Sequence, residues 1–233
     1  MIQAILFDLK GTLINVDSAD FMRNYLGILA PRFAHLLSAD KFAKQLMKSL
    51  ESSQSDPKPG QTNMQTFYDD FSKATGHSFL TLQPIFEEFY ESDFPALRCL
   101  VQAIPQGAKV VEYAIQQGFL TAVASNPVLP LNAMLEHVRW AGLTPDHFKI
   151  IPALDNFHFF KPQLGFYKEV AESLGVTPDS CLLVSGQTQD LICRELGMKM
   201  FFVGAIGAIG VEEQTDYSGD LDDLFGLISQ GNL

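Results

Sequence analysis

Four sets of polar residues in this chain could carry out chemistry, because each lies next to an apolar segment that predicts a buried element. They are Asp8, Ser125 with Asn126, Lys161, and Asp190. A carboxylate can attack a substrate and split one difficult displacement into two easier steps. An ammonium beside it can neutralise the charge that develops in the transition state. Taken singly, each residue could be a turn, cap or surface residue, but their order along the chain favours a common site.

Apolar runs alternate with helical periodicity through the second half of the chain, and this alternation predicts βαβ units. Strands are expected over residues 3–7, 119–124, 149–152, 181–184 and 200–203. Strands separated by helices of this length pair in parallel, so the sequence predicts an α/β fold with a doubly wound, mostly parallel, Rossmann-type sheet. Ligands of such sheets bind beyond the carboxyl ends of the strands, where the four sets of polar residues fall.

Residues 17–96 carry helical periodicity instead, with Phe and Met stripes that are typical of buried helix faces. Ser38 is expected to cap one helix and Asn63 to begin another. The strand at residues 3–7 belongs to the sheet although it lies before this segment, so the segment is an insertion. We therefore predict an α/β core of residues 1–16 and 97–233 with an α-helical cap of residues 17–96.

The four sets of residues resemble, in the same order, the four motifs of the haloacid dehalogenase-like (HAD) hydrolases. The matching segments are residues 8–13, 124–126, 160–162 and 183–190. The helical insertion between the first two is similar to the cap of one subclass of that family. This resemblance covers nearly the whole chain, and it implies the HAD-like fold and a hydrolase of the small-molecule phosphatase type.

The resemblance also implies a role for each residue. Asp8 would be the nucleophile, Ser125 would hold oxygens of the transferring group, and Lys161 would neutralise charge on Asp8 and on the transition state. The substrate-binding positions implied are Gly11, Thr12, Asn126 and Ser185. Phosphatases of the family need Mg²⁺, which here would be held by Asp8, the backbone carbonyl of residue 10 and Asp190.

Two positions depart from the phosphatase pattern. Most phosphatases of the family carry a second Asp two residues after the first, which passes a proton to the leaving group, and here that position is Lys10. Losing a general acid or base typically costs roughly 10²–10⁴ in rate. The fourth motif usually has a metal-binding carboxylate where this chain has Gly186, or Ser185 if the loop is aligned one residue differently. Neither residue can be an anionic ligand, so the Mg²⁺ site is doubtful.

Two interpretations of Lys10 stay open at this point. Its ammonium could occupy the space of the Mg²⁺ ion and pair with Asp8 and Asp190. Alternatively, its side chain could point to solvent and leave the pocket disabled.

Three functions follow from these residues. The first is a phosphatase-type hydrolase that is impaired by the two departures. The second is a non-catalytic relative that binds a metabolite or a protein. The third is a metal-free dehalogenase, because a halide leaves without a proton. Dehalogenases of the family need an Arg from the cap, so Arg23 or Arg32 would have to lie over Asp8.

The composition restricts the partners and the compartment. The net charge of −11 disfavours nucleic acid and anionic membranes, and no apolar run approaches the roughly 18 residues that span a bilayer. No secretory signal is recognisable, and Cys99, Cys181 and Cys193 match no zinc motif, so they are expected to be buried reduced thiols. We expect a cytoplasmic protein with a small, anionic substrate; its oligomeric state is left open. The acidic residues 212–223 are expected to form a solvated surface and tail.

Overall fold

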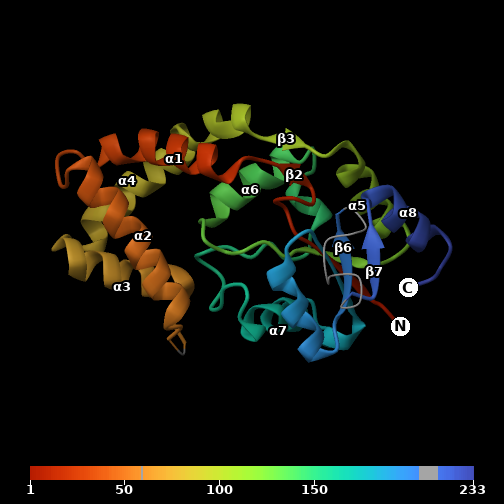
Figure 1. Ribbon diagram of the computed structural model, residues 1–233. Coiled ribbons are helices and arrows are strands. Elements are labelled where there is room, and N and C mark those ends of the chain that lie inside the picture. The colour runs from red at the N-terminus through yellow and green to blue at the C-terminus, as the bar shows by residue number, and fades with distance from the viewer. Residues whose placement is uncertain (59, 205–214) are drawn as a thin grey trace.

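The computed structural model describes residues 1–58, 60–204 and 215–233, and its centre is a five-stranded parallel sheet (Figure 1). The strands are β1 (Ala4–Phe7), β4 (Leu120–Val123), β5 (Cys181–Ser185), β6 (Lys199–Val203) and β7 (Tyr217–Gly219). Their order across the sheet is β4-β1-β5-β6-β7, and every neighbouring pair runs in parallel.

Strand β1, which lies between β4 and β5, is fully buried because helices cover both faces of the sheet. Ile5 and Phe7 enter one hydrophobic cluster, whereas Ala4 and Leu6 enter the other. The first cluster also holds side chains of α5 (Pro105–Gln116), α6 (Leu131–Trp140) and α8 (Leu221–Ser229), and the second those of α7 (Leu164–Ser173) and η4 (Thr188–Leu196). The predicted doubly wound α/β fold is therefore confirmed.

The strand predicted over residues 149–152 is wrong. Only Ile150 forms a bridge, to Ala122 of β4, and Lys149 N donates to Thr121 O at 2.8 Å. Pro152 has no N–H with which to continue the ladder, so the segment leaves the sheet after a single contact.

The acidic stretch near the C-terminus is more ordered than a solvated tail, and β7 and α8 were not predicted. Asp220 caps α8, because its side chain accepts from the backbone N–H groups of Asp222 and Asp223. Carboxylates at a helix N-terminus satisfy otherwise unpaired N–H groups and complement the helix dipole. Glu212 and Glu213, which belong to the predicted stretch, lie outside the described residues.

Four long helices form a bundle at one end of the molecule (Figure 1). Along the chain, these helices lie between two short strands. These elements are β2 (Ile14–Asn15), α1 (Ser18–Arg32), α2 (Ala39–Ser55), α3 (Asn63–Thr75), α4 (Phe79–Ser92), η1 (Phe94–Leu100) and β3 (Gln102–Ala103). Ser38 takes the N-cap position of α2, as predicted, but its side chain makes no capping hydrogen bond; Asn63 begins α3, as predicted. β2 and β3 pair antiparallel, so the chain enters and leaves the bundle at the same place. The division into a core and a cap at residues 16/17 and 96/97 stays a prediction.

Aromatic rings fill the interior of the bundle. Phe33 stacks on Phe42 with ring centroids 4.3 Å apart, and Phe86 lies 4.7 Å from Phe33. The bundle also packs against the sheet domain through α6, where Trp140 stacks on Phe94 at 5.3 Å. This packing places the end of the bundle above the carboxyl ends of the strands.

The remaining elements are the short 3-10 helices η2 (Pro145–His147) and η3 (Pro178–Ser180). Cys181 and Cys193 are buried, as predicted, and burial raises the pKa of each thiol to about 12. Cys99 is exposed, contrary to prediction, because it lies on the outer side of η1. Throughout the part of the chain that the structure describes, no helix combines the length and the apolar character needed to cross a membrane.

Candidate active site

The carboxyl ends of β1 and β4 bring together polar residues that are far apart in the sequence. Asp8 comes directly after β1, and Ser125 with Asn126 follows β4. The backbone N–H of Asp8 still donates to Val184 O of β5, at 2.9 Å. The sheet ladder therefore holds the Asp8 backbone in place up to the residue that carries the carboxylate.

Lys161 forms a buried ion network with two predicted carboxylates. Its Nζ lies 2.7 Å from Asp190 Oδ2 and 3.4 Å from Asp8 Oδ1. The three side chains are 0–4 % exposed. Removing ions from water costs several kcal/mol per ion, so buried charges persist only where they are paired and hydrogen-bonded. The structure thus brings Asp8, Lys161 and Asp190 into one site.

Tyr167 forms a hydrogen bond with the second carboxylate oxygen of Asp190. Its hydroxyl donates to Asp190 Oδ1 at 2.7 Å, while Asp190 Oδ2 faces the Lys161 ammonium. Burial and the neighbouring Asp190 charge raise the pKa of Tyr167, so its hydroxyl remains a proton donor at neutral pH. Both oxygens of Asp190 are therefore engaged by protein groups.

The environment of Asp8 favours its neutral form more than water does. Burial raises the pKa of Asp8, and the Asp190 charge adds to this effect. The Lys161 ammonium, a hydrogen bond from the Ser125 side chain and one from the Leu9 backbone lower the pKa, but burial outweighs them. An ionised Asp8 is therefore a poorly solvated carboxylate, which makes it a stronger nucleophile than a carboxylate in water.

The loop that carries Lys161 is held by side-chain amides. Asn126 Oδ1 accepts from Lys161 N at 3.1 Å, and Gln163 Oε1 accepts from Phe160 N at 3.0 Å. The Lys161–Pro162 peptide bond is cis. Asn126, predicted to bind substrate, thus also positions the backbone of the residue that neutralises Asp8.

Lys10 does not pair with the buried carboxylates. Its side chain is exposed at the wall of the cavity, and within the described residues it forms no ion pair with Asp8 or Asp190. The Lys161 ammonium takes the position between the two carboxylates instead. The hypothesis that Lys10 pairs with Asp8 and Asp190 is therefore wrong. The Lys10 side chain is exposed instead, as the other interpretation of this residue expects.

Three of the predicted substrate-binding residues stabilise the loops below the site. Gly11 has a φ of 77°, which L-residues with a side chain rarely adopt. Thr12 Oγ1 accepts from Gly186 N at 3.2 Å, and Ser185 Oγ accepts from Gln187 N at 3.0 Å. The side chains of Thr12 and Ser185 are fully buried, and neither lines the cavity.

The residues around Asp8 do not fit a Mg²⁺ ion, which requires octahedral oxygen ligands. A Cβ on residue 186 would lie 2.9 Å from the carbonyl oxygens of Gly11 and Val203, so a carboxylate side chain has no room there. Asp190 is already bound on both oxygens. Within the described ranges, no group of three or more His, Cys, Asp or Glu side chains is arranged to hold a metal ion.

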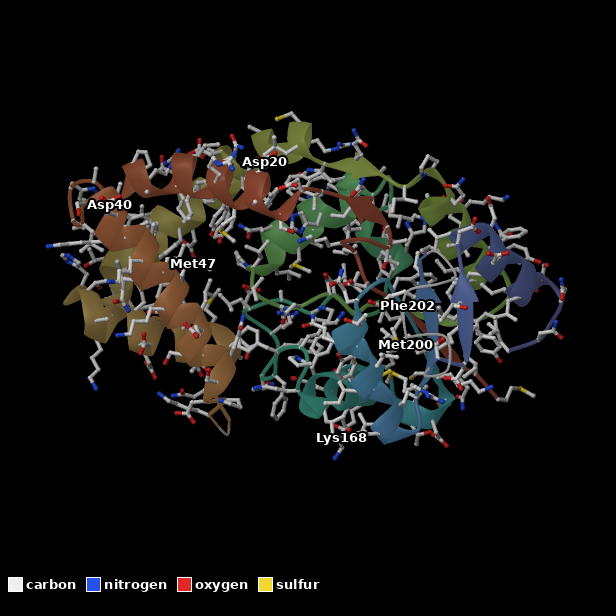
Figure 2. The ribbon with its side chains drawn as sticks, in the orientation of Figure 1. Asp20, Asp40, Met47, Lys168, Met200 and Phe202 are labelled. Atoms are coloured by element: carbon white, nitrogen blue, oxygen red, sulfur yellow. The ribbon has the colours of Figure 1, made fainter. Side chains whose placement is uncertain are left out.

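A cavity of about 340 Å³ opens above Asp8, between the helical bundle and the carboxyl ends of the strands. This volume lies within the range of about 300–1,000 Å³ that is usual for small-molecule sites. The core contributes polar side chains, namely Asp8, Lys10, Ser125, Asn126, Lys161, Gln187 and Gln189. The bundle contributes mainly apolar ones, such as Phe21, Met22 and Met47, the last of which lies on the side of α2 that faces the core (Figure 2).

The arginines considered for a dehalogenase do not lie over Asp8. Arg23 pairs with Asp20 at 2.6 Å on the surface, and its side chain is 74 % exposed. Arg32 pairs with Asp93 at 2.5 Å and with Glu88 at 2.9 Å. Neither lines the cavity, in which the lining cations are Lys10 and Lys161.

Sequence reasoning missed several residues of the site. Tyr167 reads as one more buried aromatic on a helix, and only its contact with Asp190 reveals its role. Gln187 lines the cavity and its Nε2 donates to Lys10 O at 3.3 Å. Its place in the loop that follows the strand predicted over residues 181–184 is a signal that could have identified it. His137 also lines the cavity, and burial lowers its pKa to about 4, so it is neutral above that pH.

Solved structures similar to this chain fall into two chemical groups. A HAD phosphatase from Thermococcus onnurineus matches with a TM-score of 0.61 and 18% identity, over 97% of this chain and 98% of the other. An L-2-haloacid dehalogenase from Xanthobacter autotrophicus, with chloropropionic acid covalently bound, matches with a TM-score of 0.57 and 19% identity, over 98% and 99%. CbbY from Rhodobacter sphaeroides, in complex with phosphate, matches with a TM-score of 0.58 and 20% identity, over 96% of both chains.

No protein-family model matches the sequence, and no curated protein matches it either. At these identities the likeness to solved structures establishes the fold. It does not by itself separate phosphate chemistry from halide chemistry.

Proposed function

We propose that this chain, which has the fold of the haloacid dehalogenase-like hydrolases, is a hydrolase that uses Asp8 as its nucleophile without a bound Mg²⁺ ion. The observation that carries this proposal is the position of Lys161 Nζ, between Asp8 at 3.4 Å and Asp190 at 2.7 Å. The ammonium supplies the positive charge that a metal ion would otherwise supply beside the nucleophile.

The residue at position 10 restricts the leaving group. A group that leaves as an alkoxide needs a proton donor, and losing one costs roughly 10²–10⁴ in rate. A halide leaves as a stable anion and needs no proton. Lys10 can neutralise an anion at the cavity wall but, as an ammonium, it cannot act as the base for water attack. Lys10 therefore fits halide chemistry better than phosphate-ester chemistry.

The net charge of the site also favours a haloacid over a phosphate ester. With Asp8 ionised, the buried network of Asp8, Asp190 and Lys161 carries a net charge of about −1. A phosphate monoester would add nearly two further negative charges beside Asp8, whereas a haloacid adds one, which Lys10 can balance. The phosphatase-type function suggested by the sequence therefore becomes the second candidate.

The reaction proceeds in two steps. An Asp8 oxygen attacks the carbon that bears the halogen, an ester bond forms, and the carbon–halogen bond breaks with its electron pair on the halide. Water then adds to the Asp8 ester carbonyl, one of its protons passes to the departing oxygen of the hydroxy acid, and the other is released to solvent as the Asp8 carboxylate is regenerated. Lys161 stabilises the negative charge in both steps. Lys10 takes the part of the cap arginine that dehalogenases of the family use.

Halide release from 2-chloropropionate tests the proposal. We expect turnover that is unchanged by a chelator and abolished in Asp8→Asn. Asp20→Asn, which changes an exposed carboxylate on α1, is the matched control and should retain activity.

Two other results would assign a different function. Hydrolysis of phosphate esters that depends on Mg²⁺, with no halide release, would contradict the proposal and favour a phosphatase. Saturable binding of small anions without turnover of either substrate class would identify a non-catalytic binding protein.

A further inference from the structure

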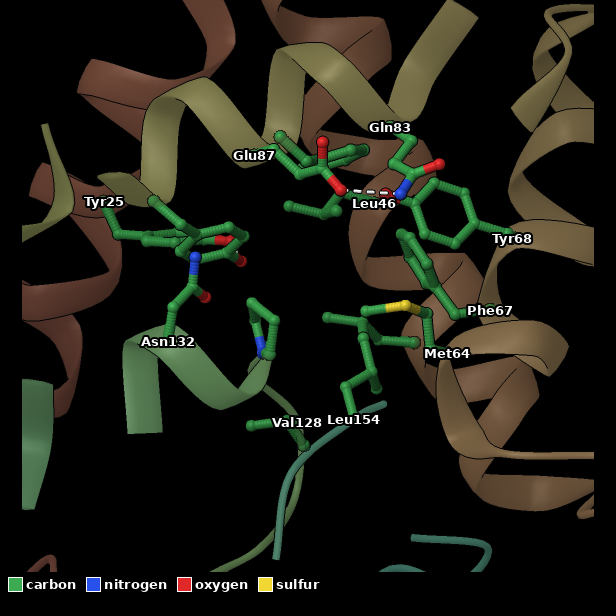
Figure 3. A pocket seen from close by; sticks show the side chains of 14 residues that line it. Tyr25, Leu46, Met64, Phe67, Tyr68, Gln83, Glu87, Val128, Asn132 and Leu154 are labelled. Atoms are coloured by element: carbon green, nitrogen blue, oxygen red, sulfur yellow. Dashed lines mark hydrogen bonds between the residues drawn. The ribbon is translucent and has the colours of Figure 1, made fainter. Parts of the chain in front are cut away.

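A second, smaller cavity lies between the helical bundle and the part of the core that carries Val128, Asn132 and Leu154 (Figure 3). Its volume is about 70 Å³. Four side chains line both cavities, namely Tyr25, Leu46, Leu50 and Val128. These four side chains are therefore the wall that the two cavities share.

The lining of this cap cavity is mainly apolar. Met64, Phe67 and Tyr68 of α3 lie on one side, and Tyr25 of α1 lies opposite (Figure 3). Most of its polar groups are paired with one another, because Gln83 Nε2 donates to Glu87 Oε1 at 2.6 Å and the Tyr25 and Tyr90 hydroxyls share a hydrogen bond of 2.7 Å. Such a cavity rewards an apolar group that enters it, because water inside has few hydrogen-bond partners.

We propose that the two cavities form one elongated site for an anion with an unbranched aliphatic chain. The chain passes between Tyr25 and Leu50, and its end lies in the cap cavity. A water molecule occupies about 30 Å³ in the liquid, so the cap cavity holds about two or three carbon atoms. The inference rests on the proposed function only for the position of the anionic end, close to Lys10 and Asp8.

The length dependence of binding follows from burial of the chain. Each methylene that leaves water strengthens binding by about fourfold. We expect this gain to continue until the chain end fills the cap cavity and then to stop. A site confined to the cavity above Asp8 would show no further gain once that cavity is full, whatever residue stands at position 50.

Calorimetric titration with the straight-chain carboxylates from acetate to octanoate tests the inference. These probes lack a leaving group, so the result does not depend on turnover. We expect affinity to rise by about fourfold per carbon over the middle of the series and then to level off.

Leu50→Trp and Met47→Trp form a matched pair one helical turn apart on α2. Leu50 lines both cavities, whereas Met47 lines only the one above Asp8. Leu50→Trp should lose the gain in affinity for long acids, whatever its affinity for short ones, and Met47→Trp should keep the dependence on length. Leu50→Phe repeats the test with less added volume if Leu50→Trp does not fold.

Three results would overturn the inference: no binding at any length, no gain beyond the shortest acids, or a gain that survives in both Leu50 variants. Halide release could still be observed in each of these cases, so failure of this inference and failure of the proposed function are distinguishable.

Discussion

Asp8 shows how the burial that favours a reaction also opposes folding. The carboxylate lies in a site with 4 % exposure, and desolvation raises its pKa in spite of Lys161 nearby. A raised pKa means that the folded protein holds the Asp8 proton more tightly than the unfolded chain does. Ionisation of Asp8 in the folded protein therefore lowers the stability of the fold.

Asp8→Asn should accordingly be more stable than the unmodified protein at pH 7, although it is inactive. Below the pKa of the unfolded carboxyl, Asp8 is protonated in both states and the difference should vanish. As pH rises through the raised pKa of folded Asp8, the free energy of unfolding of the variant should come to exceed that of the unmodified protein. The difference should be about 1.4 kcal/mol for each unit by which folding raises the Asp8 pKa. Calorimetric unfolding of both proteins at several pH values measures this difference in stability.

Asp20→Asn, an exposed change, should show no such dependence on pH. If Asp8→Asn were less stable than the unmodified protein at pH 7, the attraction of Lys161 would outweigh desolvation. The assigned environment of Asp8 would then be wrong.

At the scale of elements, the loop after β5 decides whether the site can hold a metal ion. Gly186 lies between the turn that follows β1 and the end of β6, close to the carbonyl oxygens of Gly11 and Val203. Backbone atoms on both sides cannot move aside as a flexible side chain can. The space beside residue 186 is therefore set by the packing of three neighbouring strands, not by that residue alone.

Gly186→Asp, which restores the carboxylate of the family motif, should therefore fail to create a Mg²⁺ site. Overpacking against the two carbonyls should cost about 1–3 kcal/mol of stability. Thermal unfolding with and without Mg²⁺ measures both effects. The control is Gly226→Ala, because a Cβ at residue 226 meets nothing within 4 Å. A Gly186→Asp protein stabilised by micromolar Mg²⁺ would show that the metal site was lost through one substitution only.

For the whole molecule, the contact between the bundle and the sheet domain determines the shape of the cavity. Trp140 of α6 stacks on Phe94 of η1, and its ring lies 4.8 Å from that of His137 and 6.4 Å from that of Phe21. His137 and Phe21 both line the cavity above Asp8. The rings that join the two parts of the molecule are therefore adjacent to the cavity above Asp8.

Trp140, the one tryptophan of the sequence, should report on ligand binding. Saturating 2-chloropropionate or octanoate should change its emission, with the same midpoint as calorimetry. In the free protein the emission should stay constant from pH 8 to 5 and change near pH 4, where His137 takes up a proton. His137→Gln should lose that pH-dependent step. Unchanged emission at saturating ligand would place the ligand elsewhere.

The meeting of Asp8, Lys161 and Asp190 in one place was predictable, because strand ends and their flanking residues are local features of the sequence. Asp8 lies directly after β1 and Lys161 lies in the loop before α7, as the predicted order of strands and helices implies. The helical character of residues 17–96 was also evident from the spacing of Phe and Met. Chain periodicity depends on neighbours three or four positions away, so it survives without tertiary information.

The sequence by itself determined the fold class and the residues that meet at the strand ends, because both follow from short-range patterns. Tertiary structure alone decided that Lys161, and not Lys10, lies between the carboxylates, that Tyr167 engages Asp190 and that Arg23 and Arg32 lie away from the cavity. These outcomes depend on which way side chains point across elements that are separated by tens to more than a hundred residues. The second cavity likewise exists only because four helices and α6 pack together, and no local pattern encodes the space left between them.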